Sequence, residues 1–233
     1  MLGEFLEISI ESQNVLESVR FYERLGFKQV TVGDVWDHHY GVVTDGRLFL
    51  GLHNYSFPSP SLTFVAPPIL RRIRELEAIN IDFEFRKLDI DQFHEAGFFD
   101  PDGQMVCLLE ARTYHLPQLD HDNFSLCGFF NDYRLPVRNA DESKLFWEKL
   151  GLMSLHDDDD DIPVMCAKGI NIALDEDRRL RTPMLSFHTN TLEQIYEQLD
   201  ARQIPVEHDR RNDALRIRTP DAVDIGIFAA PEH

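Results

Sequence analysis

A ten-residue segment of this chain occurs twice. Ser18 to Phe27 reads SVRFYERLGF, and Ser143 to Leu152, 125 residues later, reads SKLFWEKLGL. Self-similarity at a fixed offset is the signature of a duplicated structural unit. The offset predicts two domains of roughly 115 residues, a common size for a domain with its own core. We place the first domain at residues 1–114 and the second at 122–230, joined by a polar linker between Arg112 and Asn123.

Composition excludes several function classes. The formal net charge of −18 opposes binding to nucleic acid or to an anionic membrane surface. The first ten residues, MLGEFLEISI, lack the basic start of a secretory signal, and no apolar stretch is long enough to span a bilayer. The three cysteines form no CxxC pair, which suits a reducing compartment. We therefore expect a cytoplasmic protein whose partner is a small molecule, and a homodimer is left open.

The first half of the chain repeats one order of elements. A strand at 5–10 precedes a helix at 15–25 that ends at Gly26, and three apolar runs follow, at 28–32, 40–43 and 47–52. A second copy begins with a strand at 61–65 and a helix from Pro68. It closes with strands at 82–85 and 105–109, the latter after an Asp-Pro-Asp-Gly turn at 100–103. Each copy indicates a βαβββ module.

The second half follows the same scheme. Helices are expected at 141–150 and 192–202, and strands at 133–137, 170–174, 184–188 and 224–228. Thr219 to Ala222 stands where the Asp-Pro-Asp-Gly turn stood. The sequence thus predicts an α+β fold of four βαβββ modules, two per domain. Their strands would curl into cupped mixed sheets, and a concave sheet face is a natural site for a small ligand.

These motifs resemble the vicinal oxygen chelate superfamily, also called the glyoxalase/bleomycin-resistance/extradiol-dioxygenase fold. The marks are S-x-x-F-Y-x-x-x-L-G-F at 18–27, and the 100–103 turn running into a strand that ends in Leu-Leu-Glu at 108–110. The resemblance covers nearly the whole chain and implies equivalent core positions for Phe21 and Phe146. Members include metal-dependent lyases, isomerases, dioxygenases and thiol transferases, and also metal-free proteins that sequester bleomycin. The fold does not decide among these activities.

The resemblance also implies which positions face into each cup. The first-strand ligand position falls on Glu7 and Asp132, and the position at the end of each domain's first module falls on His53 and Asp175. The first strand of the following module offers Ser61 or Leu62, and Pro183 or Met184. The last-strand position falls on Cys107 and Gly226.

A metal site needs three or four compatible donors that converge. The second domain lacks that set. In the first domain Glu7, His53 and Cys107 are all residue types that bind metals, although their combination departs from the family's patterns. We favour the reading in which Glu7 and His53 bind each other or a polar ligand while Cys107 is a small buried side chain, so that no metal is bound.

Two functions stay open. One is a glyoxalase/bleomycin-resistance-like protein that binds a neutral or cationic small molecule without metal. Its cup residues would be Glu7, His53, Cys107, Tyr55, Phe57, Asp132 and Asp175. The alternative is a lyase, isomerase or dioxygenase with a divalent metal at Glu7, His53 and Cys107 that polarises its substrate. Whether the chain is an enzyme is undecided at this level, and the second domain is the one expected to have lost its site.

Overall fold

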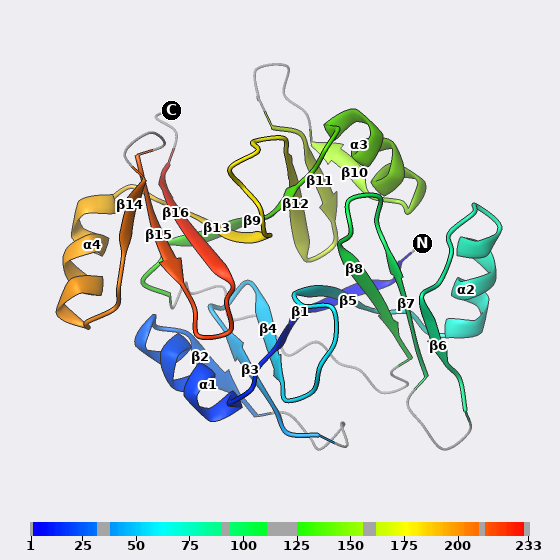
Figure 1. Ribbon diagram of the computed structural model, residues 1–233, viewed down its shortest axis with the longest axis horizontal. Helices are drawn as coiled ribbons and strands as arrows, with labels where there is room; N and C mark the ends of the chain where they lie inside the picture. The colour runs from blue at the N-terminus through cyan, green and yellow to red at the C-terminus, as the bar shows by residue number, and fades with distance from the viewer. Residues whose placement is uncertain are drawn as a thin grey trace. The chain divides into compact units, whose positions relative to one another are not determined.

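The computed structural model describes residues 2–31, 38–89, 94–110, 125–155, 162–209 and 213–230. The predicted linker and its flanks, residues 111–124, lie outside these ranges. The described residues form two mixed sheets of eight strands and four helices, as expected for an α+β fold of four modules (Figure 1). The strand order is β2-β3-β4-β1-β5-β8-β7-β6 in one sheet and β10-β11-β12-β9-β13-β16-β15-β14 in the other.

The two sheets share one plan, in which each module contributes four strands and one helix. The first sheet contains β1 (Glu4–Glu11), β2 (Lys28–Val30), β3 (Tyr40–Thr44), β4 (Phe49–His53), β5 (Ser61–Val65), β6 (Phe85–Lys87), β7 (Glu95–Phe99) and β8 (Met105–Leu109). The second contains β9 (Phe129–Pro136), β10 (Met153–Leu155), β11 (Val164–Ala167), β12 (Ile170–Asp175), β13 (Met184–Thr189), β14 (Glu207–Asp209), β15 (Ala214–Arg218) and β16 (Asp224–Ala229). The helices are α1 (Val15–Arg24), α2 (Ile69–Glu77), α3 (Ala140–Lys149) and α4 (Leu192–Ala201).

Five strands were not predicted from the sequence: β7, β10, β11, β14 and β15. β10 and β14 have three residues each and lie at sheet edges, where short polar segments carry little apolar periodicity. β7 reads EAGFF, and glycine and alanine are poor strand formers that hide its pattern. β6 begins at Phe85, three residues beyond the predicted start of that strand. The four modules were nevertheless predicted, because that prediction depends on the sequence repeat and not on recognising every strand.

The duplicated segment forms α1 and α3, and both helices begin and end in the same way. Asn14 and Asn139 are the N-caps, and each side chain accepts a hydrogen bond from the backbone N–H three residues later. Past the C-terminus, Gly26 and Gly151 have φ of +89° and +97°, which only glycine adopts readily. The repeated motif therefore encodes a complete capped helix.

Phe21 and Phe146 occupy equivalent positions, but both are only half-buried rather than in the core. The following residues, Tyr22 and Trp147, are the ones with no exposed surface. In each helix the two neighbouring rings stand almost perpendicular, at 86° for Phe21 and Tyr22 and 87° for Phe146 and Trp147. Successive helical residues point about 100° apart, so only one of the two can face the sheet. Tyr22 and Trp147 have that role.

The chain divides into two compact units, each made of three segments. Unit 1 consists of Met1–Ser9, Pro58–Gln118 and Leu135–Arg181, and it contains α2 and α3. Unit 2 consists of Ile10–Phe57, Leu119–Arg134 and Thr182–His233, and it contains α1 and α4. Within unit 2, α1 packs on β2, β3 and β4, and α4 packs on β15 and β16. The division into domains 1–114 and 122–230 stays a prediction.

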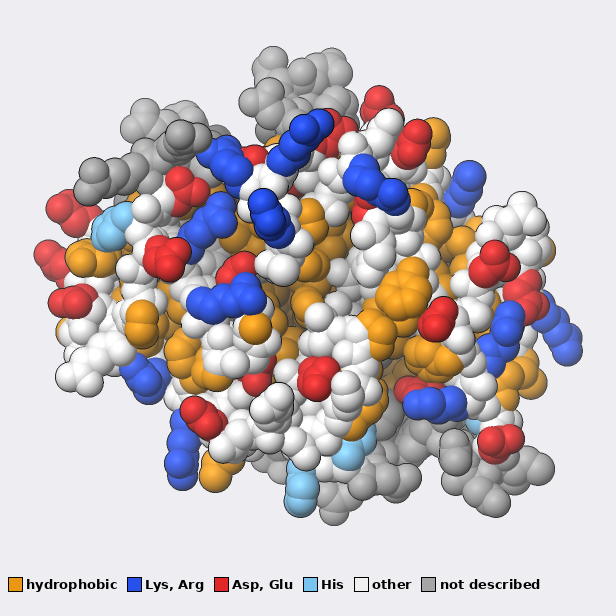
Figure 2. Space-filling view, viewed as in Figure 1, with side chains coloured by type: hydrophobic (Ala, Val, Ile, Leu, Met, Phe, Trp, Pro, Cys, Tyr) orange, Lys and Arg blue, Asp and Glu red, His pale blue; other side chains and the backbone are white. Residues whose placement is uncertain are grey.

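No helix in the described part of the chain is long and apolar enough to cross a membrane. On the face drawn in Figure 2, acidic and basic side chains are interspersed. The cytoplasmic location and the lack of a nucleic-acid partner remain predictions.

Candidate functional site

In unit 1, three neighbouring strands place Glu7, Thr63 and Cys107 in one row. Glu7 of β1 pairs with Thr63 of β5, and Thr63 pairs with Cys107 of β8. Directly paired residues project from the same face of a sheet. The Ser9 hydroxyl joins the row by donating a hydrogen bond to Glu7 Oε1 at 2.9 Å and contacting Thr63 Oγ1 at 2.7 Å. The result is a buried carboxylate surrounded by hydroxyls.

The Cys107 thiol is held in its protonated form. Burial raises its pKa to about 12, the charge of Glu95 adds to this, and Ser61 and Lys87 act in the opposite direction. Thiolate is the form that attacks electrophiles and binds metals. Without a metal, the thiol form of Cys107 is therefore favoured at neutral pH, and the absence of a metal at this position stays a prediction.

In unit 2, His53 belongs to a cluster of rings that we call the imidazole cluster: His38, Tyr40, His53, Tyr55 and Phe57. His53 Nδ1 lies 3.0 Å from His38 Nε2, within hydrogen-bonding distance. The ring of Tyr40 stacks on His53 at 5.7 Å between centroids and 8° between planes, and Tyr55 stacks on Phe57 at 4.7 Å. His53 is buried, whereas Tyr55 is 37% exposed. The cluster thus links a buried imidazole to an accessible aromatic face.

Unit 2 also contains the second-domain row, in which Asp132 of β9 pairs with Ser186 of β13 and Ser186 pairs with Gly226 of β16. Asp132 and Ser186 are both almost fully buried. Asp132 Oδ2 accepts a hydrogen bond from Asn131 Nδ2 at 2.6 Å, and Oδ1 lies 3.6 Å from Arg134 Nε. The row provides a carboxylate and a hydroxyl, and Gly226 adds no donor.

The electrostatics of this row couple Asp132 to His188, which lies two residues beyond Ser186 on β13. Burial raises the pKa of Asp132, although Arg134, Asn131 and His188 oppose the rise. Burial lowers the pKa of His188, and the negative charge of Asp132 opposes that change. Burial therefore disfavours the charged form of both groups.

Asp175 ends β12 in unit 1 and stabilises a turn. Its Oδ1 accepts a hydrogen bond from the backbone N–H of Asp177 at 2.8 Å, and its carbonyl accepts one from Val137 at 2.9 Å. These contacts give Asp175 a structural role within its unit. Its predicted contact with a ligand stays a prediction.

Strand register identifies the residue that stands opposite each acid on the neighbouring strand. Thr63 pairs with Glu7, and Ser186 pairs with Asp132. The ligand positions inferred on these strands from the resemblance, Ser61 or Leu62 and Pro183 or Met184, stay predictions.

The donors in these rows do not match a metal site. The unit 1 row provides one carboxylate, two hydroxyls and one thiol, so only two of its donors are of the kinds that transition-metal sites use. Within the described ranges, no three His, Cys, Asp or Glu side chains converge on a point that could hold an ion. The absence of a bound metal is still a prediction that metal analysis has to test.

By sequence, no protein-family model matches this chain, and no curated protein does. By structure it is similar to an extradiol ring-cleaving dioxygenase from Brevibacterium fuscum, with a TM-score of 0.64, 18% identity, and 100% of this chain and 73% of that one covered. A second match is the anaerobic complex of homoprotocatechuate 2,3-dioxygenase with 3,4-dihydroxyphenylacetate. Its TM-score is 0.63 and its sequence identity 16%, and the match covers 99% of this chain and 80% of that one. A third is catechol 2,3-dioxygenase, with a TM-score of 0.57 and 16% identity, and this match covers 99% of this chain and 89% of that one. The chain therefore shares the fold of these ring-cleaving dioxygenases.

Proposed function

We propose that this chain binds a small molecule through polar side chains on its sheets and does so without a metal. The register of β1, β5 and β8 carries the proposal. It places a carboxylate, two hydroxyls and a protonated thiol side by side, a set that recognises a ligand by hydrogen bonds.

The proposed contacts differ between the two units. In unit 1, Glu7 and Cys107 would contact polar groups of the ligand. In unit 2, His53 and Tyr55 of the imidazole cluster would contact its rings or apolar parts, and Asp132 is a further candidate. Asp175 is the weakest of the proposed residues because turn contacts already occupy its carboxylate. A neutral or cationic ligand fits best, since the protein carries a net charge of −18.

The alternative is a lyase, isomerase or dioxygenase with a divalent metal at Glu7, His53 and Cys107. The likeness to ring-cleaving dioxygenases over nearly the whole chain favours it. Against it stands the ligand set, because the combination of Glu7, His53 and Cys107 departs from the family's patterns.

Metal analysis separates the two functions. Protein purified without a histidine tag should carry less than about half an equivalent of iron, nickel, manganese or zinc, because a full ligand set is lacking. Near-stoichiometric metal that disappears in Cys107→Ser or His53→Ala would support the alternative instead. Oxygen uptake with 3,4-dihydroxyphenylacetate after addition of Fe²⁺ would do the same.

A metabolite screen by thermal shift tests the binding itself. A ligand that binds the folded protein raises its melting temperature, and Glu7→Gln should weaken that binding about tenfold by removing a charged hydrogen-bond acceptor. Asp200→Asn, at an exposed position on α4, is the control and should leave the affinity unchanged. If binding instead survives both Glu7→Gln and His53→Ala but is lost in Asp175→Ala, the ligand binds in the second domain, and the assignment to Glu7 and His53 is wrong.

A further inference from the structure

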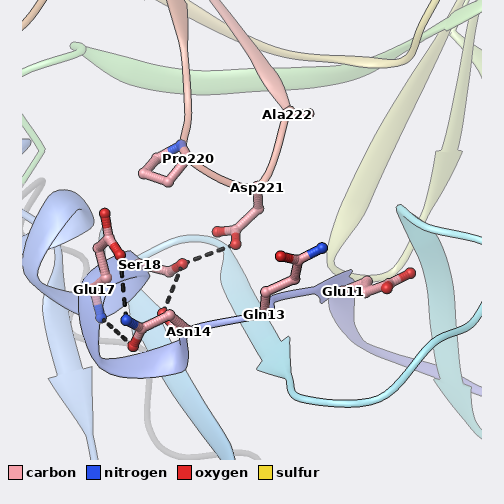
Figure 3. A pocket seen from close by; sticks show the side chains of 8 residues that line it. All are labelled: Glu11, Gln13, Asn14, Glu17, Ser18, Pro220, Asp221 and Ala222. Atoms are coloured by element: carbon pink, nitrogen blue, oxygen red, sulfur yellow. Dashed lines mark hydrogen bonds between the residues drawn. The ribbon is translucent and has the colours of Figure 1, made fainter.

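Unit 2 contains a cavity of about 380 Å³ at the N-terminus of α1, beside the turn that joins β15 to β16 (Figure 3). Three of its lining residues are acidic: Glu11, Glu17 and Asp221. None of the described residues that line it is a lysine or arginine. The volume falls in the range of small-molecule sites, roughly 300–1,000 Å³. The cavity is therefore large enough for a small ligand, and its wall is negatively charged.

Asp221 is the best-placed carboxylate in this cavity. Its Oδ1 accepts a hydrogen bond from Ser18 Oγ at 2.8 Å, as Figure 3 shows. Its Oδ2 is buried and has no hydrogen-bond partner among the described residues. Burial raises the pKa of Asp221, and the charge of Glu17 adds to the rise, while hydrogen bonds from Ser18 and Ser12 oppose it. Asp221 as a whole is half-buried, and one oxygen of its carboxylate is thus left without a partner among the described residues, which costs free energy.

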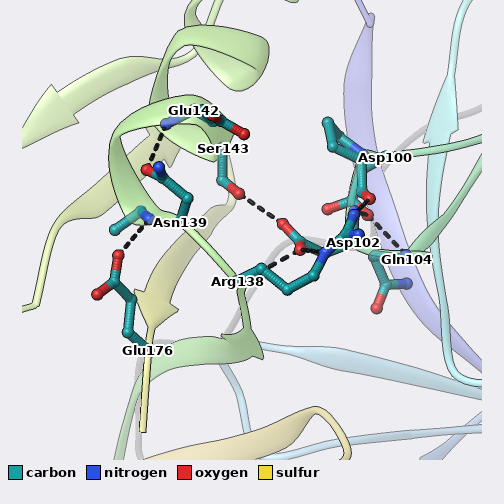
Figure 4. A network of polar contacts seen from close by, with 10 residues as sticks. Asp100, Asp102, Gln104, Arg138, Asn139, Glu142, Ser143 and Glu176 are labelled. Carbon is teal, nitrogen blue, oxygen red and sulfur yellow. Dashed lines mark hydrogen bonds and ion pairs between the residues drawn. The ribbon is translucent and has the colours of Figure 1, made fainter. Parts of the chain in front are cut away.

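Unit 1 contains the duplicate of this arrangement (Figure 4). Asp102 holds the same place in its turn as Asp221, and Ser143 holds the same place in the repeated motif as Ser18. Ser143 Oγ donates to Asp102 Oδ2 at 2.6 Å, which reproduces the contact between Ser18 and Asp221. The two sites therefore share a carboxylate, a hydroxyl and a helix N-terminus.

In unit 1 a guanidinium completes the site. Arg138 precedes the N-cap Asn139, and its Nε and backbone N–H both donate to Asp102 Oδ1 at 3.0 Å. Its Nη2 donates to the carbonyl of Pro101. The corresponding residue before the N-cap Asn14 is Gln13, which is neutral. Thus the same residue pattern binds a cation in one unit and has no cation of its own in the other.

The pKa values of Asp102 and Asp221 shift in opposite directions. Burial acts to raise the pKa of Asp102, but hydrogen bonds from Ser143 and Arg138 outweigh it, and the pKa is lowered. At Asp221, where Gln13 replaces the arginine, the pKa is raised. Asp221 is also more buried and has Glu17 beside it, so the guanidinium is one of several differences between the two sites.

We propose that the unit 2 cavity binds a small organic cation through a guanidinium or primary ammonium group, which takes at Asp221 the place that Arg138 has at Asp102. Glu11 and Glu17 add negative charge around it. A divalent metal fits less well, since no cluster of three ligating side chains was found among the described residues. This site is separate from the residues of the proposed function and does not depend on them.

The probe is methylguanidinium chloride, titrated into the full chain by calorimetry at constant ionic strength. Tetramethylammonium chloride, which has no N–H donor, is the control salt. We expect saturable binding of methylguanidinium with one site per chain and none of tetramethylammonium. Asp221→Asn should weaken binding about tenfold or more, the effect of losing one charged hydrogen-bond acceptor. The matched surface variant Asp200→Asn should leave it unchanged.

Two reciprocal variants use the duplication. Gln13→Arg copies the unit 1 sequence and should abolish binding while leaving Asp221 in place, so it does not depend on Asp221→Asn folding correctly. Arg138→Gln copies the unit 2 sequence and should create a second site. Binding that persists in Gln13→Arg, or a titration in which methylguanidinium behaves like tetramethylammonium, would overturn the proposal. So would a divalent cation that binds in the cavity while methylguanidinium does not.

Discussion

Gly128→Ala should destabilise the protein by about 3 kcal/mol, a large share of the 5–15 kcal/mol typical of a folded chain. Gly128 has φ of +94°, and a Cβ there would lie 2.4 Å from the carbonyl oxygen of His188. Both the backbone conformation and the neighbouring backbone resist the extra atom. Urea unfolding followed by circular dichroism should show the loss, and the melting temperature should fall by roughly 6–12 °C.

Gly103→Ala is the matched control. Gly103 has φ of +97°, but a Cβ there would meet nothing within 4 Å. Its cost should be about 1–2 kcal/mol, from backbone conformation alone. Equal losses in the two variants would mean that the contact with His188 is not a constraint. Gly3 corresponds to Gly128 in the first module, with a Cβ position 2.1 Å from the carbonyl oxygen of Val65, and should behave like Gly128.

Asp100→Asn should stabilise the protein at pH 7 by about 2–3 kcal/mol. Burial raises the pKa of Asp100 to about 6, even though the backbone N–H groups of Gln104 and Asp102 donate to it. A carboxyl whose pKa is raised by folding favours the folded state when protonated. Its contribution is complete below about pH 4 and is lost as the pH rises through about 6. Asparagine keeps the acceptor oxygen and cannot ionise.

The measurement is the free energy of unfolding from pH 4 to pH 8 for both proteins. The wild type should lose stability relative to Asp100→Asn across the lower half of that range, and the difference should level off above pH 7. A constant difference at every pH would contradict the assignment. The fourth module already uses an uncharged residue at this position, since Thr219 Oγ1 accepts the hydrogen bond from Val223.

Much of the fold could be predicted because the sequence contains the βαβββ module four times. The Asn caps, the glycines after α1 and α3, and the repeated turn each mark one boundary, and the duplication lets one copy support another. The edge strands could not be predicted in the same way, since β10 and β14 are too short to show a period. Their existence follows from pairing with β11 and β15.

The candidate site was predictable only in part. Glu7 and Cys107 lie in one row across β1, β5 and β8, and only the strand register shows that Thr63 stands between them. His38 lies two residues before Tyr40 in the sequence, and only the fold shows its contact with His53. The acidic cavity joins two distant segments of the chain, and Glu11 and Asp221 on its wall are 210 residues apart. The sequence signal for this cavity was the difference between Gln13 and Arg138, which hold equivalent positions in the repeat.

The composition of the two units has a consequence for synthesis on the ribosome. Each unit combines segments from both halves of the chain, so neither is complete when residues 1–114 have emerged. Residues 10–57 cannot complete unit 2 until Thr182–His233 has been synthesised. Until then the nascent chain exposes apolar surface that the later segment will cover. Slow, non-local assembly of this kind favours chaperone binding and aggregation during synthesis. Separately expressed halves should accordingly be poorly soluble alone and should recover native structure only when mixed.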